Sequence, residues 1–215
     1  MKKNIFLLIL VLNSIISFGQ LEDNDTLLDK SKSSKYLFKA YIQRCPEGNS
    51  NCKEQCVINI YSKQSKKLFQ VLSFEQDDEW EMSLKYGINY GDFNFDGIKD
   101  FSIAYTQGGM YCDGRRKFYI FDSMKNKFIY SKELTDTIMD YCEYDYDIKK
   151  KEIIGFVHQG CCYHGDDHFV WNGNKLIKIF ERIQDDTIDS IFSLFTVKRF
   201  VNGKWKVTEY KKKRE

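Results

Sequence analysis

One short stretch of the sequence places oxygen-bearing side chains at the spacing of a calcium-binding loop. In residues 91–100 polar residues fall at every second position, a glycine follows at the sixth place of the loop, and another carboxylate stands at the ninth. Ca²⁺ takes about six to eight oxygen ligands from such a loop, and Gly97 permits the sharp turn. The predicted ligands are the side chains of Asp92, Asn94, Asp96 and Asp100 and the backbone carbonyl of Ile98.

The residues after this loop distinguish it from an EF-hand. An EF-hand ends with a bidentate glutamate on a helix. Here the corresponding position is Ile103, within residues 101–106, where large apolar residues alternate with small or polar ones. This period of two predicts a strand with one face in the core. We therefore expect a strand–loop–strand calcium site with a structural role. The alternative is an aspartate-rich turn that binds no ion, in which the carboxylates would repel one another.

A second group of chemically active residues lies at 158–168, which contain all three histidines together with Cys161 and Cys162. These residue types can bind zinc or copper, or form a cysteine–histidine nucleophile pair. The spacing matches no zinc-binding pattern, however, and oxidised cysteines do not ligate a metal. We expect a rigid glycine-containing loop, held by a disulfide, that presents His164, Asp166 and His168 at the surface.

A similar loop is expected at residues 108–116, which contain several glycines and one cysteine. Binding residues often lie on loops that a rigid scaffold positions. Two glycine- and cysteine-bearing loops beside strand ends resemble a recognition rim. The candidate residues for contact with a partner are Tyr111, Arg115, His164, Asp166 and His168.

The sequence carries no recognisable catalytic motif, and we therefore predict a protein that is not an enzyme. G-x-S-x-G, H-E-x-x-H and a phosphate-binding loop are missing. The acidic pairs Asp77/Asp78 and Asp185/Asp186 could serve glycoside hydrolysis. They lie in charged runs, which are typical of solvated loops.

The N-terminus has the features of a secretory signal peptide. Two lysines precede an apolar stretch at 5–16, and Ser17 and Gly19 suit a signal peptidase site. We expect residues 1–19 to be a signal peptide, residues 20–35 a flexible leader and residues 36–215 a single all-β domain. This indicates a periplasmic or secreted protein with no membrane span after cleavage.

Two forms of membrane attachment are less well supported than a cleaved signal peptide. An uncleaved N-terminal anchor is an alternative, although the apolar stretch is short for a transmembrane helix. A lipoprotein is disfavoured because the first cysteine is Cys45.

The charge balance argues against nucleic acid as a partner. The formal net charge of +2 is accounted for by Lys2 and Lys3, so the remaining chain is formally neutral. Proteins that bind nucleic acid usually carry a basic surface. The basic segment at 211–214 is expected to be a solvated tail.

The seven cysteines of an exported chain indicate disulfides, and the odd number leaves at least one thiol free or paired between chains. We expect one local bridge among the first three. A long-range bridge could join Cys112 or Cys142 to the Cys161–Cys162 pair, whose members we expect to differ in partner because adjacent cysteines rarely bridge each other. The candidates are Cys45, Cys52, Cys56, Cys112, Cys142, Cys161 and Cys162.

From Tyr36 onward the chain consists of short segments rich in aromatic and β-branched residues, separated by turn residues. An Asn-Gly pair such as Asn202-Gly203 between alternating segments is a strong hairpin signal. Only residues 185–194 suggest a short helix. The pattern predicts an all-β domain of antiparallel hairpins, built as a sandwich, a barrel or a small propeller-like unit. The expected hairpins span residues 57–72, 117–131, 144–157, 168–180 and 195–210.

Residues 91–104 resemble the calcium loop of FG-GAP and VCBS-type β-propeller repeats. From about Cys56 to Arg182 the longer order of segments is similar to that of exported calcium-binding β-propeller-like inhibitors, which protect bacteria against type IV secretion lysozyme effectors. The matching segments are Cys56-Val57-Ile58-Asn59-Ile60, Gly108-Gly109, Phe118-Tyr119-Ile120-Phe121, His158-Gln159-Gly160-Cys161 and Trp171-Asn172-Gly173-Asn174-Lys175.

This resemblance implies a non-enzymatic periplasmic protein that binds and inhibits a lysozyme-like peptidoglycan hydrolase. The calcium ligands carry over position by position onto the loop residues named above, whereas no inhibitory motif can be matched residue by residue. The missing lipobox and the segment 189–215 depart from the family pattern. Two alternatives remain. One is a secreted hydrolase or carbohydrate-binding module with Tyr111, Tyr163 or Trp171 as a sugar platform, and the other is a structural envelope protein stabilised by calcium.

Overall fold

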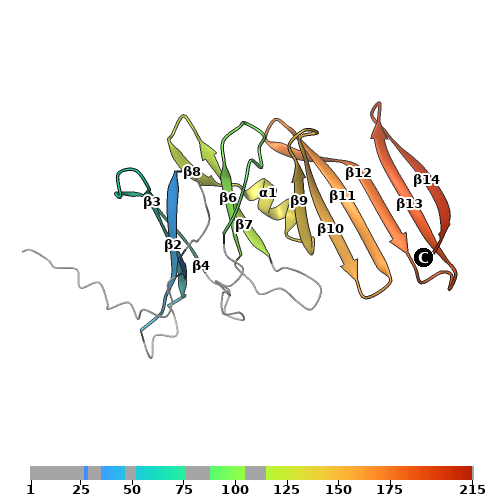
Figure 1. Ribbon diagram of the computed structural model, residues 1–215, viewed down its shortest axis with the longest axis horizontal. Coiled ribbons are helices and arrows are strands. Elements are labelled where there is room, and N and C mark those ends of the chain that lie inside the picture. Colours follow the sequence, from blue (N-terminus) through green and yellow to red (C-terminus); the bar gives the residue numbers. More distant parts are fainter. Residues whose placement is uncertain (1–26, 29–34, 47–51, 76–87, 105–114, 215) are drawn as a thin grey trace, which may run out of the picture.

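The described part of the chain forms three antiparallel β-sheets and one short helix (Figure 1). The computed structural model describes residues 27–28, 35–46, 52–75, 88–104 and 115–214. In each sheet, strands that are neighbours in space are also consecutive in sequence. The prediction of an all-β fold made of antiparallel hairpins is therefore confirmed. The predicted signal peptide lies outside the described residues.

In the first sheet, buried and more exposed residues alternate along the strand β2, which places one face of the sheet in the core. In β2, Phe38, Ala40 and Ile42 are buried, and the residues between them are more exposed. The short strand β1 pairs with Lys39 and Ala40 of β2, so this part of the expected flexible leader is a strand. The strands are β1 (Leu27–Leu28), β2 (Tyr36–Gln43), β3 (Gln55–Ser62) and β4 (Leu68–Glu75).

The second sheet lies between the other two and is buried on both faces. All five residues of β6 are buried, and neighbouring residues of β7 enter different cores, Phe118 one and Tyr119 the other. The prediction that β6 has only one face in the core is therefore wrong, because the strand belongs to a middle layer. The strands are β5 (Ile88–Gly91), β6 (Asp100–Ala104), β7 (Arg116–Asp122) and β8 (Lys127–Tyr130).

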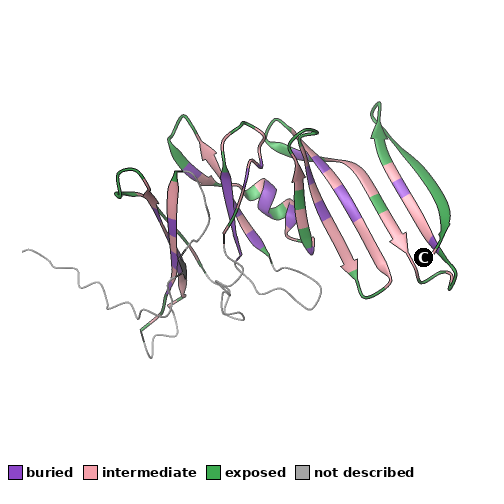
Figure 2. Ribbon diagram, in the orientation of Figure 1, coloured by how far each residue is buried: buried purple, intermediate pink, exposed green. Residues whose placement is uncertain are grey.

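The third sheet is the widest and ends in an exposed hairpin. Every residue of β14 is exposed, and β13 and β14 lie at the far right of the molecule in Figures 1 and 2. Most of the basic segment at 211–214, which was expected to be a tail, pairs with β13. The strands are β9 (Glu143–Asp147), β10 (Glu152–Gln159), β11 (Tyr163–Asn172), β12 (Lys175–Asp185), β13 (Phe192–Val201) and β14 (Lys204–Lys213).

Two hydrophobic cores join the three sheets into a stack. One core packs Phe38 and Ile58 of the first sheet against Phe101 of the second. The other packs Phe118 of the second sheet against helix α1 (Lys132–Ile138) and against Ile153 of the third. The architecture is thus sandwich-like. The described strands form no closed barrel, and Figure 1 shows the sheets in a row.

The short helix lies where the sequence was not expected to form one. The side chain of Ser131 caps α1 by accepting a hydrogen bond from the amide of Leu134, whose own side chain is buried together with that of Ile138. The helix expected at 185–194 is wrong. Its aspartates accept hydrogen bonds from nearby backbone amides, Asp185 from Thr187 and Asp189 from Ile191. Such local bonds favour turns over helix.

The cysteines follow the predictions in part. Cys45 and Cys52 form the expected local disulfide, and Cys56 is buried and free. Cys142 is also disulfide-bonded, whereas Cys112 lies outside the described residues.

The expected long-range bridge to the adjacent cysteines is wrong, since Cys161 and Cys162 bridge each other. Adjacent side chains of a strand point to opposite faces. These two cysteines lie in the turn between β10 and β11, where that restriction does not apply.

No helix in the described ranges is long and apolar enough to span a membrane.

Candidate functional site

The predicted calcium loop joins β5 to β6, so it is flanked by strands on both sides. Gly97 has a φ of +87°, in agreement with the sharp turn assigned to it from the sequence. Phe95 also adopts a positive φ, 59°, which is unusual for a bulky residue. The surrounding contacts must therefore hold this loop in a specific conformation.

The three polar side chains at alternate loop positions all accept hydrogen bonds from backbone amides within the loop. The two oxygens of Asp92 accept hydrogen bonds from the amides of Asp96 and Gly97, at 3.0 and 2.9 Å. Asp96 in turn accepts a bond from the amide of Ile98 at 2.8 Å and one from the side-chain amide of Asn94 at 2.8 Å. The loop thus gathers oxygen atoms toward its interior.

Asp100 has a role that the sequence did not reveal. It is fully buried, and its two oxygens accept hydrogen bonds from the amides of Phe93 and Phe121, at 2.8 and 2.9 Å. Burial raises the pKa of this carboxyl to about 7, while the two hydrogen bonds oppose the rise. Asp100 therefore ties the loop to β7. Its predicted contact with calcium, direct or through a water, stays a prediction.

The donor set of the loop fits a hard cation. Neither Asp92 nor Asp96 has a basic partner among the described residues, and Asp100 carries a third carboxyl close by. Among the described residues, no group of three or more His, Cys, Asp or Glu side chains is arranged to hold a metal ion by itself. An ion here would therefore need the amide oxygen of Asn94, the carbonyl of Ile98 and water besides the carboxylates. Mixed oxygen ligation of this kind is typical of Ca²⁺.

The loop is anchored to the third sheet as well as to its own. Phe93 is fully buried, and its ring packs edge-on against Phe118 and Tyr146, with centroids 5.2 and 5.3 Å away. The indole nitrogen of Trp171 donates a hydrogen bond to the carbonyl of Phe93 at 2.8 Å. Trp171, considered from the sequence as a sugar platform, is thus occupied in holding the loop.

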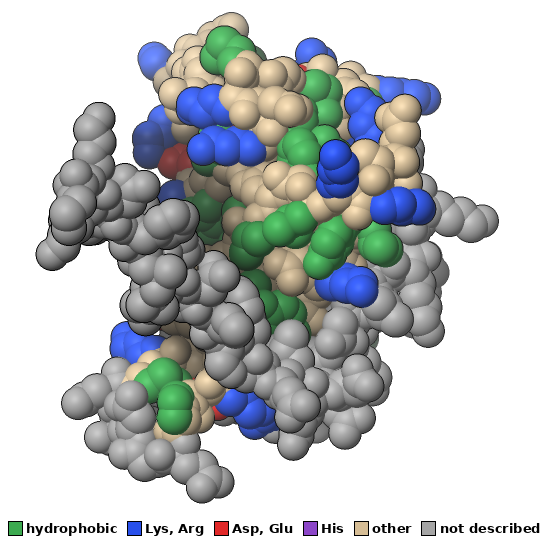
Figure 3. Space-filling view, turned by 90° about the vertical axis from the view of Figure 1, so that its left-hand side faces the viewer, with side chains coloured by type: hydrophobic (Ala, Val, Ile, Leu, Met, Phe, Trp, Pro, Cys, Tyr) green, Lys and Arg blue, Asp and Glu red, His purple; other side chains and the backbone are tan. Residues whose placement is uncertain are grey.

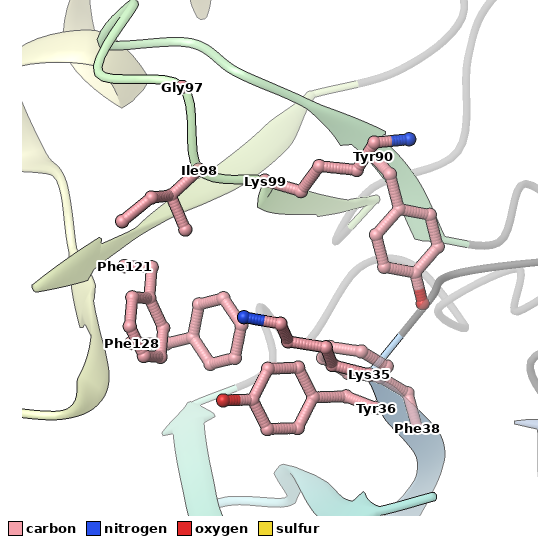
Figure 4. A pocket seen from close by; sticks show the side chains of 9 residues that line it. All are labelled: Lys35, Tyr36, Phe38, Tyr90, Gly97, Ile98, Lys99, Phe121 and Phe128. Atoms are coloured by element: carbon pink, nitrogen blue, oxygen red, sulfur yellow. The ribbon is translucent and has the colours of Figure 1, made fainter. Parts of the chain in front are cut away.

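One side of the loop forms a wall of an aromatic pocket (Figure 4). Gly97, Ile98 and Lys99 lie opposite the first sheet, and Lys35 places a second ammonium group on the lining. The rings on the lining are those of Tyr36, Phe38, Tyr90, Phe121 and Phe128. The conformation of the calcium loop therefore shapes a pocket between the first two sheets.

Residues 158–168 form most of a hairpin, so the prediction of a loop is wrong here. Only residues 160–162 turn, between β10 and β11. His164, Asp166 and His168 occupy alternate positions of β11 and therefore face the same side of the sheet. That side is the outer face of the third sheet, which ends the stack in Figure 1.

Two residues that the sequence did not single out complete this group. His168 lies 2.7 Å from Glu152 and 3.0 Å from Asp166 through its two ring nitrogens. Arg182 donates to the other oxygen of Asp166 at 2.6 Å. The register places Glu152 and Arg182 on the neighbouring strands β10 and β12. Only the pairing of strands, which sequence reasoning did not supply, could have revealed them.

The network sets the charges of its members. Burial alone would raise the pKa of Asp166, but hydrogen bonds from His168 and Arg182 outweigh it and lower that pKa. The hydrogen bond to Asp166 raises the pKa of His168 despite burial, and the bond to Glu152 adds to the rise. Asp166 is itself buried, at 5% exposure. It organises this surface, and His168 and Arg182 cover it.

Two rows of residues cross the outer face of the third sheet, with acidic groups toward β9 and basic groups toward β14. Ring and charge contacts link the middle of the first row, because Phe180 packs against His168 and the guanidinium of Arg199 lies over Phe180. One row, read across successive strands, is Asp145, Ile154, His168, Phe180, Arg199 and Lys206. The other is Glu143, Phe156, Asp166, Arg182, Val197 and Thr208.

The second expected recognition loop is not brought to this face by any described residue. Tyr111 and Cys112 lie outside the described residues. Arg115 directly precedes β7 and so belongs to the second sheet, not to the third. Arg115 and the predicted partner residues on β11 thus come from different layers of the stack.

The opposite end of the molecule is a mixed basic and apolar surface (Figure 3). Leu68 and Val71 of β4 are about half exposed, and the ammonium of Lys39 lies over the ring of Tyr61. Lys63 and Lys66 line the same shallow pocket as Lys39.

Comparison with known proteins supports the fold. The sequence matches no protein-family model and no curated protein. The structure is similar to that of a Xanthomonas type IV secretion system related protein, with a TM-score of 0.57 and 18% sequence identity. The similarity covers 81% of this chain and 90% of that chain. The sandwich-like stack is therefore shared with a protein of known structure.

Proposed function

We propose that this protein is an exported, calcium-binding, non-enzymatic protein that binds and inhibits a lysozyme-like peptidoglycan hydrolase. The observation that carries the proposal is the fold shared over most of both chains with a type IV secretion system related protein. The order of sequence segments, which resembles inhibitors of type IV secretion lysozyme effectors, points the same way. The disulfide between Cys45 and Cys52 suits an oxidising compartment such as the periplasm.

The outer face of the third sheet is the proposed contact surface. Glycoside hydrolases use a pair of carboxyl groups in the active-site cleft. Arg182 and Arg199 are exposed on this face, on β12 and β13, and His168 on the adjacent strand β11 has a raised pKa. Cations in that arrangement complement an acidic cleft, and electrostatic complementarity speeds and orients association.

The proposed role of calcium is to hold the loop between β5 and β6 in shape. The loop lines the aromatic pocket on one side and contacts Trp171 of the third sheet on the other. An ion that fixes the loop would therefore stabilise both the aromatic pocket and the packing of the loop on the third sheet. Calcium is not proposed to take part in catalysis.

Inhibition assays with a panel of lysozyme-like hydrolases test the function. The purified protein is expected to form a complex with at least one of them on size-exclusion chromatography and to slow its hydrolysis of peptidoglycan. Arg182→Glu and Arg199→Glu should weaken that complex, whereas Lys150→Glu, in the exposed turn between β9 and β10, should not. Complex formation that is unaffected by either arginine variant would remove the outer face as the contact surface.

The aromatic pocket favours one alternative, carbohydrate binding. Tyr36 and Tyr90 with Lys35 and Lys99 could hold a sugar that bears a carboxylate (Figure 4). Binding on a glycan array that is lost in Tyr36→Ala, without any hydrolase complex, would favour this reading over inhibition.

A further inference from the structure

Two histidines face each other at the end of the β10–β11 hairpin. His158 and His164 are direct cross-strand partners, and their Nδ1 atoms are 2.9 Å apart. The rings are nearly perpendicular, with an interplanar angle of 79°. The turn between them contains the Cys161–Cys162 disulfide, which restricts the backbone that carries both rings.

A backbone contact fixes the tautomer of His164. Its Nε2 atom lies 3.1 Å from the carbonyl oxygen of Cys161. A carbonyl only accepts hydrogen bonds, so Nε2 carries the hydrogen, and in the neutral ring Nδ1 keeps its lone pair toward His158. Metal-bound histidines commonly donate their second ring N–H in this way, which orients the ligating nitrogen.

We propose that His158 and His164 chelate one divalent copper ion through their Nδ1 atoms. Two cis ligands about 2.0 Å from a tetragonal ion are separated by about 2.8 Å, whereas a tetrahedral ion separates them by about 3.3 Å. In the metal-free protein the two Nδ1 atoms are held 2.9 Å apart by their hydrogen bond, so replacing that hydrogen by a tetragonal ion requires little change in their separation. Cu²⁺ prefers that geometry and binds imidazole most tightly among the divalent first-row ions.

The surroundings of the pair suit a cation with open positions. Gln184 lies opposite His164 on β12. Its side-chain amide donates to Asp186, whose backbone amide in turn donates to the carbonyl of Cys162 in the turn. Water completes the coordination, and the oxidised cysteines of the turn stay out of it. When the ion binds, the Nδ1 hydrogen that links the metal-free pair moves to the Nε2 atom of His158.

The three histidines of the chain allow a clean experiment. CuCl₂ is titrated into the untagged protein by calorimetry, and the Cu²⁺ complex is examined by electron paramagnetic resonance. The expected result is one ion per chain, with hyperfine coupling to two imidazole nitrogens. His158→Gln and His164→Gln should each weaken binding on the order of 100-fold, because the second imidazole then no longer binds intramolecularly. His168→Gln, which leaves the pair intact, should bind as the wild type does.

Several outcomes would overturn the proposal. A wild-type resonance spectrum without coupling to two nitrogens would do so, and this measurement does not depend on whether any variant folds. One-to-one copper binding that persists in the double variant, checked for folding by circular dichroism, would also contradict it. Tighter binding of Zn²⁺ than of Cu²⁺ would contradict the tetragonal assignment.

Discussion

At the scale of single residues, burial separates structural groups from binding groups. Asp100 and Asp166 both belong to motifs that predicted binding chemistry, yet both are buried, and each of their carboxylate oxygens accepts a hydrogen bond. Arg182, the exposed partner of Asp166, was not predicted from the sequence. Residue types and spacing identified the right neighbourhoods. Strand pairing decides which side chain is buried in a structural role and which one is exposed for binding, and the spacing of residues in the sequence does not reveal that pairing.

The Glu152–His168–Asp166 network makes stability depend on pH. Because the folded pKa of His168 is raised, its contribution is fully present below the unfolded pKa of about 6.5 and is lost as pH rises through the folded value. The free energy of unfolding of the wild type should therefore exceed that of His168→Gln most at about pH 6 and less at about pH 9. Urea unfolding of both proteins across this range measures the difference. A difference that grows with pH would contradict the assigned contacts.

At the scale of elements, local sequence signals predicted the hairpins. They failed for segments whose structure depends on contacts with neighbouring elements. The alternating segments after Tyr36 became strands, as expected. The helix α1 was missed although Ser131 is a suitable cap and Leu134 and Ile138 share a helix face, because the preceding strand β8 continued the hairpin pattern. Residues 158–168 were expected to form a long loop because of their glycines and cysteines. Only 160–162 turn, because the residues on both sides pair with each other and with the neighbouring strands β9 and β12.

Gly155 on β10 shows how closely the third sheet packs on the segment that follows α1. A Cβ atom at this position would lie 2.5 Å from the ring of Tyr141. That ring cannot withdraw easily, because its hydroxyl donates to Asp167 and its edge packs on Phe169. Gly155→Ala should lower the free energy of unfolding by about 1–3 kcal/mol. In the same urea experiment Thr208→Ala on exposed β14 should change it by less than about 0.5 kcal/mol. Equal effects of the two substitutions would contradict the packing described.

The calcium loop allows a second test at this scale. Ca²⁺ at ten times its Kd should stabilise the protein by about 1.4 kcal/mol, or roughly 3–6 °C in melting temperature. Asp96→Ala should abolish the response, whereas Asp136→Ala, an exposed carboxylate on α1, should retain it. Thermal melts with calcium and with chelator measure both. A wild-type melt that calcium does not change would eliminate the site.

At the scale of the whole molecule, the three sheets form a stack with two unlike ends. The sequence predicted the fold class but left sandwich, barrel and propeller-like arrangements open, because alternation specifies which face of a strand is buried and not which sheet covers it. The position of the second sheet between the other two follows only from the two hydrophobic cores that it shares with them. The stack leaves an outer face of ordered ion pairs at one end and a basic, apolar face at the other.

The rate of peptidoglycan hydrolysis tests the central claim most directly. Increasing amounts of the purified protein are added to each lysozyme-like hydrolase of a panel, and lysis of cell-wall suspensions is followed by turbidity. We predict that the rate for at least one hydrolase falls to background near one molecule of protein per molecule of enzyme. Undiminished rates for every hydrolase, with the protein folded, calcium-loaded and in large excess, would contradict it.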